Sequence, residues 1–359
     1  MNHRSGWLLF RVARLIFLLD MAMFAIPAQA QTFAYVTDIF ANTVSVIDTA
    51  SNTVVATVAV GGGPVGVAIT PDGTRAYVAN LFDNTVSVID TTKRTVVATV
   101  AIGNAPLAVA ITPDGTRAYV SGGLVSVIDT ASNTVVATVE DPNAYGIAIT
   151  PDGTRVYVTD FLSASVAVID TANNTIIAEV AVGGHNLGVA ITPDGTHAYV
   201  ANGGTDSVSA IETATNTVTA EVPVGIEPQG VAVTSDGTRA YVTNSASNSV
   251  SVIDTVSNTV AATVAVGSTP FGVAITPDGT RAFVANESSN SVSVIDTASN
   301  TLVATVAVGS SPTWVAVTPG IGPPSDKDQC KKGGWRDFTI PRPFKNQGDC
   351  VSFVNHHRK

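Results

Sequence analysis

The chain has 359 residues and a formal net charge of −10, and only 13% of its residues are charged. Residues 31–324 carry a net charge of −16, whereas residues 325–359 carry a net charge of +4. An acidic body repels phosphate backbones, so nucleic acid is not an expected partner; a periplasmic protein that binds single-stranded nucleic acid remains an alternative that needs a local basic patch. With so few charges, the polar surface must consist mostly of Thr, Ser and Asn.

Residues 1–30 have the layout of a secretory signal peptide. Three arginines precede an apolar stretch at 15–26, and the small-residue sequence AQA at 28–30 gives a cleavage site before Gln31. The stretch is interrupted by Asp20 and is too short for a membrane-spanning helix, which needs about 20 apolar residues. The sequence therefore predicts a secreted, cell-surface or periplasmic protein with no transmembrane segment in the mature chain.

One unit of 42 residues is repeated along the chain. The string TPDG, with serine in place of proline once and truncated at the last copy, recurs at Pro71, Pro113, Pro151, Pro193, Ser235, Pro277 and Pro319. The steps between copies are 42 residues, except for one step of 38. A period of this length, made of short β-type segments, is typical of a propeller blade.

Each unit contains four segments rich in Val, Ile, Thr and Tyr. In the second unit they fall at 65–70, 75–80, 85–90 and 95–102. None has the 3.6-residue period of a helix, so all four are predicted to be strands. Pro223 falls in a fourth segment, and because proline is tolerated only at a sheet edge, the fourth strand should form the outer rim.

The aspartates that recur in every unit are predicted to shape turns. In the TPDG turn the proline fixes φ, Asp72 can bond the backbone beyond it, and Gly73 supplies a positive φ. Asp90 should act similarly in the next turn, and Arg75 is a candidate ion-pair partner. A catalytic pair or a metal ring is disfavoured because chemistry would need such residues once, whereas a turn needs them in every copy.

The two ends of the repeat region complement one another. Residues 33–38 match a second strand, and residues 313–318 match a first strand. Joining them gives an all-β, seven-bladed propeller of four-stranded antiparallel blades over residues 31–319, in which the C-terminal repeat strand completes blade one. Closure removes the open inter-blade face that a linear array would expose.

The second strands read YVTD at Tyr35 and Tyr157, YVAN at Tyr77 and Tyr199, and YVTN at Tyr241, each followed by a VSVID-like third strand. Together with the TPDG turns, this pattern resembles the YVTN family of β-propeller repeat proteins, which are secreted and surface-layer-like. The resemblance covers residues 31–319 and implies the propeller fold and export. It implies little about activity, since relatives by fold include lactonase-like enzymes and nucleic-acid-binding periplasmic proteins.

The units diverge at the end of the ring that holds the loops entering each first strand. The residues that open the seven first strands are Val65, Leu107, Tyr145, Leu187, Gln229, Phe271 and Thr313. Close to them in the sequence lie Asp141, His185, Glu227 and Trp314. Because a propeller would hold a ligand at the mouth of its central channel, these residues form the candidate ligand site. Drift of unconstrained loops is the alternative explanation.

A lactonase-like hydrolase that uses His185 and Glu227 is the enzymatic alternative. Acid–base or nucleophilic catalysis requires a base within hydrogen-bond reach of its partner, and zinc requires three or four ligands. This end of the ring offers one histidine and scattered acids, so no catalytic residue, metal or cofactor is predicted. The expected protein is a monomeric, non-enzymatic binding or surface scaffold protein whose partner is an extracellular ligand or a cell-envelope polymer.

Residues 320–324 are predicted to be a linker to a basic tail at 325–359. In an exported protein, Cys330 and Cys350 are expected to form a disulfide that stabilises the tail by roughly 3 kcal/mol. Zinc bound by these cysteines with His356 and His357 is the alternative, although adjacent histidines fit structural zinc sites poorly. A basic tail would also contact anionic wall polymers.

Overall fold

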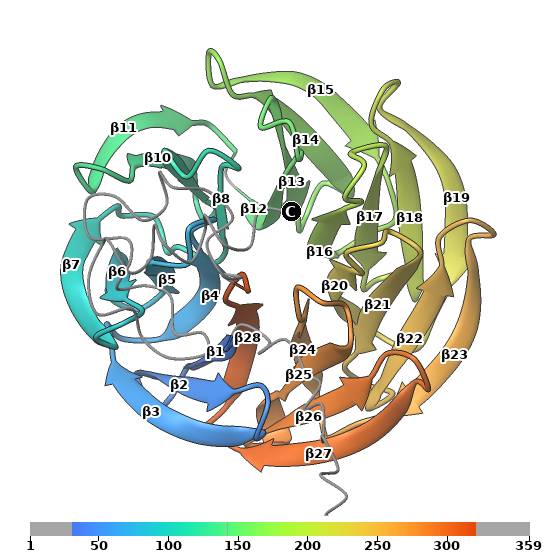
Figure 1. Ribbon diagram of the computed structural model, residues 1–359. Helices are drawn as coiled ribbons and strands as arrows, with labels where there is room; N and C mark the ends of the chain where they lie inside the picture. The colour runs from blue at the N-terminus through green and yellow to red at the C-terminus, as the bar shows by residue number, and fades with distance from the viewer. Residues whose placement is uncertain (1–30, 142, 321–359) are drawn as a thin grey trace, which may run out of the picture.

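The computed structural model describes residues 31–141 and 143–320 (Figure 1). Seven four-stranded sheets stand around a common axis, which confirms the predicted all-β propeller. Among these residues the single helical element is the 3-10 turn η1 (Glu287–Ser289), and none forms a helix long and apolar enough to cross a membrane. The predicted signal peptide and the tail with Cys330 and Cys350 lie outside the described residues.

Each blade places its first strand at the axis and its fourth at the rim. Blade one has β28 (Pro312–Val317), β1 (Phe33–Asp38), β2 (Thr43–Asp48) and β3 (Thr53–Ala59); blade two has β4 (Pro64–Ile69), β5 (Arg75–Asn80), β6 (Thr85–Asp90) and β7 (Thr95–Ala101). Blade three has β8 (Val109–Ile111), β9 (Arg117–Val120), β10 (Val125–Asp129) and β11 (Thr134–Val139); blade four has β12 (Ala144–Ile149), β13 (Arg155–Asp160), β14 (Ser165–Asp170) and β15 (Thr175–Ala181). Blade five has β16 (Asn186–Ile191), β17 (His197–Asn202), β18 (Ser207–Glu212) and β19 (Thr217–Pro223); blade six has β20 (Pro228–Val233), β21 (Arg239–Asn244), β22 (Ser249–Asp254) and β23 (Thr259–Ala265). Blade seven has β24 (Pro270–Ile275), β25 (Arg281–Asn286), β26 (Ser291–Asp296) and β27 (Thr301–Ala307).

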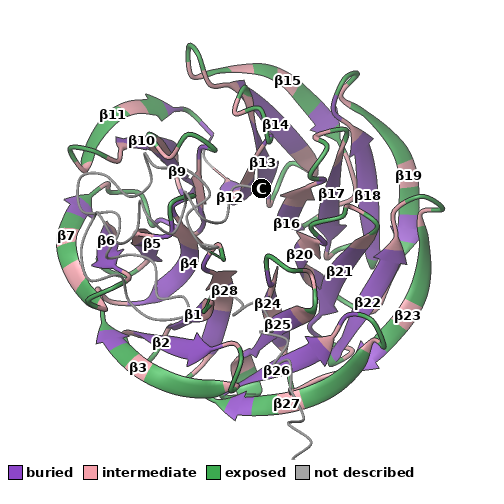
Figure 2. Ribbon diagram, viewed as in Figure 1, coloured by how far each residue is buried: buried purple, intermediate pink, exposed green. Residues whose placement is uncertain are grey.

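The predicted strands of the second unit agree with β4 to β7 to within one residue at each end. The fourth strands form the exposed outer rim, and the second and third strands are buried between neighbouring blades (Figure 2). Pro223 ends β19, which is an edge strand. This position suits proline, because proline has no backbone N–H to donate to a neighbouring strand.

Blade three departs from the expected pattern. The sequence predicts that Leu107 opens its first strand, but β8 begins only at Val109. This blade contains the short repeat, and the lost residues shorten the turn between β9 and β10. Leu107 still donates its amide to the Ser121 carbonyl at 2.9 Å, so it remains hydrogen-bonded to the segment after β9 although it precedes β8.

The turn aspartates have the predicted structural role. Asp72 Oδ1 accepts a hydrogen bond from the Thr74 amide at 3.0 Å, and Gly73 has φ of 72°. Asp90 Oδ1 accepts the Lys93 amide at 2.9 Å, and Asp90 Oδ2 lies 3.1 Å from Arg75 Nη1. The predicted ion pair is therefore present in blade two.

A tyrosine on six of the seven second strands ties its blade to the next one. Six tyrosines are almost fully buried, and five of them donate their hydroxyl to an asparagine of the following blade at 2.7–2.9 Å. The pairs are Tyr77–Asn133, Tyr119–Asn174, Tyr157–Asn216, Tyr199–Asn258 and Tyr241–Asn300. This repeated bond sets the spacing between blades inside an otherwise apolar interface.

The interface between blades seven and one lacks this bond. Phe283 occupies the tyrosine position, and Oδ1 of Asn52, the corresponding asparagine of blade one, is buried without a hydrogen-bond partner. We expect Phe283→Tyr to raise the free energy of unfolding by about 1 kcal/mol, because it supplies a donor to an unsatisfied acceptor. Thermal unfolding of this variant and of Tyr241→Phe, which deletes the equivalent bond one interface earlier, should show shifts of opposite sign. A lower melting temperature for Phe283→Tyr would contradict this account.

The ring closes where β28 pairs with β1, with Ala34 opposite Val317 and Val36 opposite Val315. Asp38, at the end of β1, is fully buried in this seam and accepts hydrogen bonds from Ser45 Oγ at 2.8 Å and Thr43 Oγ1 at 3.1 Å. Four of the other blades carry asparagine at this position: Asn80, Asn202, Asn244 and Asn286. Burial raises the pKa of Asp38 to about 6, even though hydrogen bonds from Ser45 and Thr43 oppose the shift.

The raised pKa makes closure sensitive to pH. The folded chain holds the Asp38 proton more tightly than the unfolded chain does. The free energy of unfolding should therefore rise as the pH falls from above 6 towards 4, and this contribution of Asp38 should be lost as the pH rises again. Asp38→Asn, which copies the other blades, should raise the melting temperature at pH 8 and flatten its pH dependence between 7 and 5. Asp141, whose pKa is also raised to about 6, should retain its own share of that dependence. Unfolding curves measured across this pH range test the prediction, and an unchanged slope in the variant would refute it.

Candidate functional site

The two ends of the propeller both carry more acidic than basic residues, but they differ in their content of lysine and arginine. The turn end holds the TPDG turns and the turns between third and fourth strands; the loop end holds the loops entering first strands and the turns between second and third strands. All lysines and arginines of the described residues lie at the turn end: Arg75, Lys93, Arg94, Arg117, Arg155, Arg239 and Arg281. The loop end carries Asp83, Glu140, Asp141, Asp160, Asp206, Glu227 and Glu287. The loop end is therefore an acidic surface.

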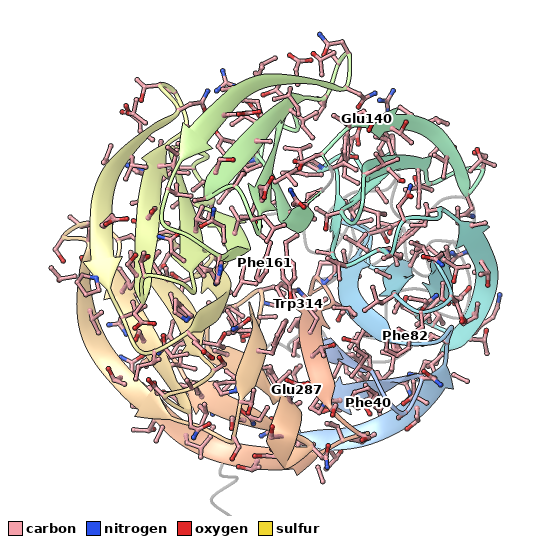
Figure 3. All side chains as sticks on the ribbon, turned by 180° about the vertical axis from the view of Figure 1, so that it is seen from behind. Phe40, Phe82, Glu140, Phe161, Glu287 and Trp314 are labelled. Atoms are coloured by element: carbon pink, nitrogen blue, oxygen red, sulfur yellow. The ribbon has the colours of Figure 1, made fainter. Side chains whose placement is uncertain are left out.

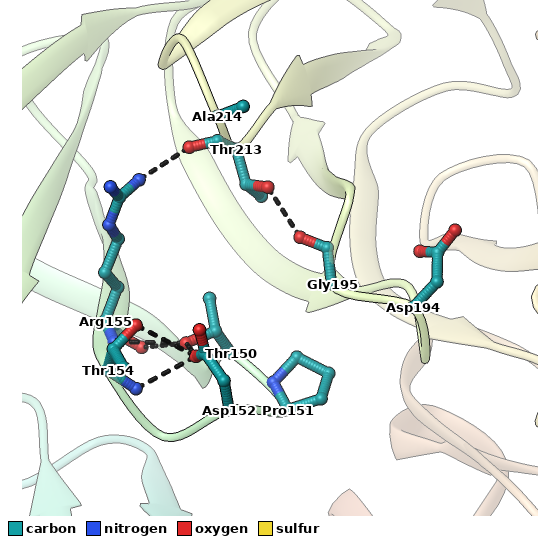
Figure 4. A pocket seen from close by; sticks show the side chains of 9 residues that line it. All are labelled: Thr150, Pro151, Asp152, Thr154, Arg155, Asp194, Gly195, Thr213 and Ala214. Carbon is teal, nitrogen blue, oxygen red and sulfur yellow. Dashed lines mark hydrogen bonds between the residues drawn. The ribbon is translucent and has the colours of Figure 1, made fainter.

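The turn end has a groove between neighbouring blades, and its polar groups bond one another. In the groove of about 270 Å³ between blades four and five, Arg155 donates to the Thr213 carbonyl at 2.6 Å (Figure 4). Thr213 in turn donates to the Gly195 carbonyl at 2.5 Å, and Asp152 accepts from Thr150 at 2.6 Å. Similar residues line the grooves between blades two and three and between blades three and four. These repeated contacts join neighbouring blades, so the polar residues of the grooves have a structural role that requires no ligand.

At the loop end, three rings form a continuous stack. Tyr145 of β12 lies 5.8 Å from Phe161, which follows β13, and Phe161 lies 5.1 Å from His185, which precedes β16. The interplanar angles are 29° and 14°, so the rings are stacked face to face. The stack brings two predicted site residues together through a third residue that the sequence did not single out.

Two further groups of predicted residues meet on the other side of the ring. Phe271 and Trp314 pack edge to face with centroids 6.0 Å apart. Gln229 Nε2 donates to Ser245 Oγ at 3.2 Å, and that hydroxyl lies 3.2 Å from Glu227 Oε2. Figure 3 shows Phe161 and Trp314 beside the axis and Phe40 and Phe82 further out. The aromatic residues of the site therefore gather at the channel mouth.

The predicted site residues differ in exposure. Val65, Leu187 and Thr313 are buried, whereas Leu107, Tyr145, Gln229, Phe271 and Trp314 are half-buried and His185 and Glu227 are exposed. The buried group forms part of the inner wall: Thr37 donates to the Val65 carbonyl at 2.5 Å and lies 3.0 Å from Thr313 Oγ1. A ligand at the mouth would contact the half-buried and the exposed residues.

Hydroxyl groups on the second strands, or directly after them, hold the inner strands in place. Ser121 donates to the Tyr145 carbonyl, and Thr243 donates to the Phe271 carbonyl at 2.5 Å. Each bond joins a blade to the first strand of the next blade, at the backbone of a variable residue. The backbone of the candidate site is thus fixed independently of which side chains it carries.

The charge of Glu287 acts on Tyr145, which lies on a different blade. Burial raises the pKa of Tyr145 to about 12, and the negative charge of Glu287 adds to the shift. Tyr145 belongs to blade four and Glu287 to blade seven. The Tyr145 hydroxyl therefore keeps its proton to a higher pH than an exposed tyrosine would.

Sequence reasoning missed Phe161, Ser245 and Glu287. All three occupy the position directly after a second strand, where the other blades carry Ile39, Leu81, Ser121 or Gly203. The variation in size and polarity at this position is as wide as in the first-strand openings. Applying the same criterion of divergence to that position would have found them.

The described residues do not join His185 and Glu227 into a catalytic pair. His185 stacks on Phe161 in the loop before blade five, and Glu227 contacts Ser245 in the loop before blade six. Both have positive φ, but so do Ala105, Thr269 and Ser311 at the same loop position. The left-handed backbone is thus a feature of the loop and gives no separate indication of catalysis.

Comparison with known proteins supports the fold. Residues 189–281 match the family described as YNCE-like beta-propeller, and no curated protein sequence matches the chain. The hydrazine synthase of Kuenenia stuttgartiensis is similar at 27% identity and a TM-score of 0.68, over 74% of this chain and 92% of that chain.

Two other solved structures share the fold. A functionally unknown protein from Desulfotomaculum acetoxidans has 23% identity and a TM-score of 0.72, over 80% of this chain and 99% of that chain. A dihydro-heme d1 dehydrogenase, NirN, in complex with DHE has 15% identity and a TM-score of 0.60, over 79% of this chain and 74% of that chain. The chain is thus similar to propellers with different roles, so its function must be argued from the channel mouth itself.

Proposed function

We propose that this chain is an exported, non-enzymatic binding protein that holds its ligand at the loop-end mouth of the propeller. The observation that carries the proposal is the stack of Tyr145, Phe161 and His185, which assembles at the mouth from three separate segments of two blades. Ligand sites combine an apolar lining with a few directional polar groups, and Gln229 and Glu287 supply such groups here. The signal-like segment at 1–30 and the resemblance to YVTN repeat proteins support export.

The loop end differs from the turn end in a way that random divergence of loop sequences would not by itself produce. The turn end repeats the same residues in grooves whose polar groups bond one another. The loop end varies from blade to blade, yet its variable aromatic side chains contact one another across blade boundaries. A cell-envelope component or a diffusible extracellular molecule is the proposed partner.

The test measures co-sedimentation of the purified protein with insoluble envelope material of the producing organism. Replacing Tyr145 and Phe271 by Ala should weaken retention about tenfold or more, because truncated aromatic anchors often cost that much. The melting temperature should change little, since both side chains are only half-buried. Phe40→Ala, which removes an exposed ring away from the axis, is the matched control and should leave retention unchanged.

Two results would overturn the proposal. Unchanged retention together with a large fall in melting temperature would show that Tyr145 and Phe271 plug the channel. Turnover of a lactone that is abolished by His185→Ala would replace binding with hydrolysis.

A further inference from the structure

The charge distribution restricts which ligands suit the mouth. The described residues place no lysine or arginine at the loop end. Glu287 acts on Tyr145 within the aromatic site, and Glu227 lies beside Ser245 and Gln229. An anionic group at this mouth would meet negative charge on several sides with no positive partner.

A buried carboxyl in the loop before β12, the strand that carries Tyr145, strengthens this restriction. Asp141 is only 5% exposed, and its Oδ2 is buried without a hydrogen-bond partner. Burial and the charge of Asp160 raise its pKa to about 6, and among the described residues neither carboxyl forms an ion pair with a lysine or arginine. An uncompensated buried charge is costly unless a positive group approaches it.

The strand register places Asp160 close to both rings along the paired strands. Ala144 and Asp160 are opposite each other in the pairing of β12 with β13, so Tyr145 and Phe161 directly follow the paired residues. Asp160 Oδ1 accepts the amides of Leu162 at 2.8 Å and Ser163 at 2.7 Å, which orients the turn that carries Phe161. Asp160 and the rings of Tyr145 and Phe161 thus belong to the same blade, and Asp160 directly precedes Phe161.

We infer that the ligand of the mouth presents an organic cation, an alkylammonium group carried by a small molecule or by a lysine side chain, which lies against the stack of Tyr145, Phe161 and His185. This inference rests on the proposed binding function and specifies its ligand class. Aromatic faces attract cations through their quadrupole, and desolvation strengthens the attraction. Glu287 supplies the opposite charge from the far side of the mouth.

An organic cation suits the site better than a metal ion does. The described residues contain no group of three or more His, Cys, Asp or Glu side chains that would hold a metal. Hard metal ions need several oxygen ligands at short distance, whereas an alkylammonium group needs apolar faces and a diffuse negative field. The stack and the separated carboxylates provide the second combination.

The experiment titrates the full-length protein by calorimetry with three probes. Choline represents the small-molecule source, trilysine represents the peptide source, and 3,3-dimethylbutanol is an uncharged analogue of choline. We expect choline or trilysine to bind at least tenfold more tightly than the neutral analogue, and the tighter cation identifies the source. Binding should weaken as salt concentration rises.

Variants test whether the cationic probe binds at the channel mouth. Glu287→Gln should weaken binding of the cationic probe several-fold, and Tyr145→Ala should weaken it about tenfold. Glu221→Gln, which removes the same charge from the exposed rim strand β19, is the matched control and should have no effect. Rescue of near-normal binding by Tyr145→Phe, which keeps the ring, would support contact with the aromatic face.

The outcomes separate this inference from the proposed function. If neither cation binds, or if the neutral analogue binds equally well, while envelope retention still depends on Tyr145 and Phe271, the mouth binds a ligand but the cationic class is wrong. If envelope retention is also insensitive to those residues, the proposed function fails as well. Cation binding that is equally weakened by Glu221→Gln would indicate attraction to the acidic body alone and would overturn the inference.

Discussion

A chain that ends at Ser311 should unfold at a much lower temperature than a chain that ends at Pro324. The longer chain keeps β28, which pairs with β1 and packs between β24 and β4 at the axis. Val315 of β28 is 3% exposed and belongs to a core cluster shared by blades seven and one. The shorter chain would leave that cluster, and the inner edge of β1, open to water.

The expected loss is large compared with ordinary substitutions. Full burial of one large apolar side chain contributes about 1.5–3 kcal/mol, and a whole domain is stable by only about 5–15 kcal/mol. Losing a strand that buries several such groups and a ladder of hydrogen bonds should therefore remove much of the stability. Calorimetric unfolding of both chains measures the difference, and equal melting temperatures would show that β28 does not close the ring.

Gly146→Ala should also destabilise the propeller strongly. A Cβ at position 146 would lie 2.0 Å from the backbone carbonyl oxygen of Leu187, so the first strands of blades four and five would have to separate. Backbone atoms cannot rotate away as a side chain can, and overpacking of this kind costs about 1–3 kcal/mol or more. The equivalent glycines Gly188, Gly230 and Gly272 meet the next blade in the same way, at 2.5–2.8 Å.

Gly184→Ala is the matched control for this substitution. Gly184 lies in the loop before blade five, where an added Cβ would meet nothing within 4 Å. Its melting temperature should stay close to that of the wild type, while that of Gly146→Ala should fall by several degrees or more. Similar melting temperatures for the two variants would mean that the inner strands have room to adjust.

The repeats in the sequence are sufficient to predict the architecture of the propeller. Strand positions, ring closure and the roles of Asp72 and Gly73 follow from local chemistry: a turn needs its own φ and its own backbone acceptor, and seven copies show which letters the turn requires. The edge position of β19 follows from Pro223 alone, since proline cannot donate to a ladder. These features depend on residues that are neighbours in the chain, or on counting copies.

The channel mouth and the interface between blades seven and one depend on contacts between residues that lie far apart in the sequence. Phe161 joins Tyr145 to His185 only because β13 and the loop before β16 meet beside the axis. Asn52 lacks a partner only because Phe283, at the other end of the chain, replaces a tyrosine. A repeat shows which positions vary, but the direction of each side chain and the charge it meets are set by how neighbouring blades pack, so only the folded ring brings these groups together.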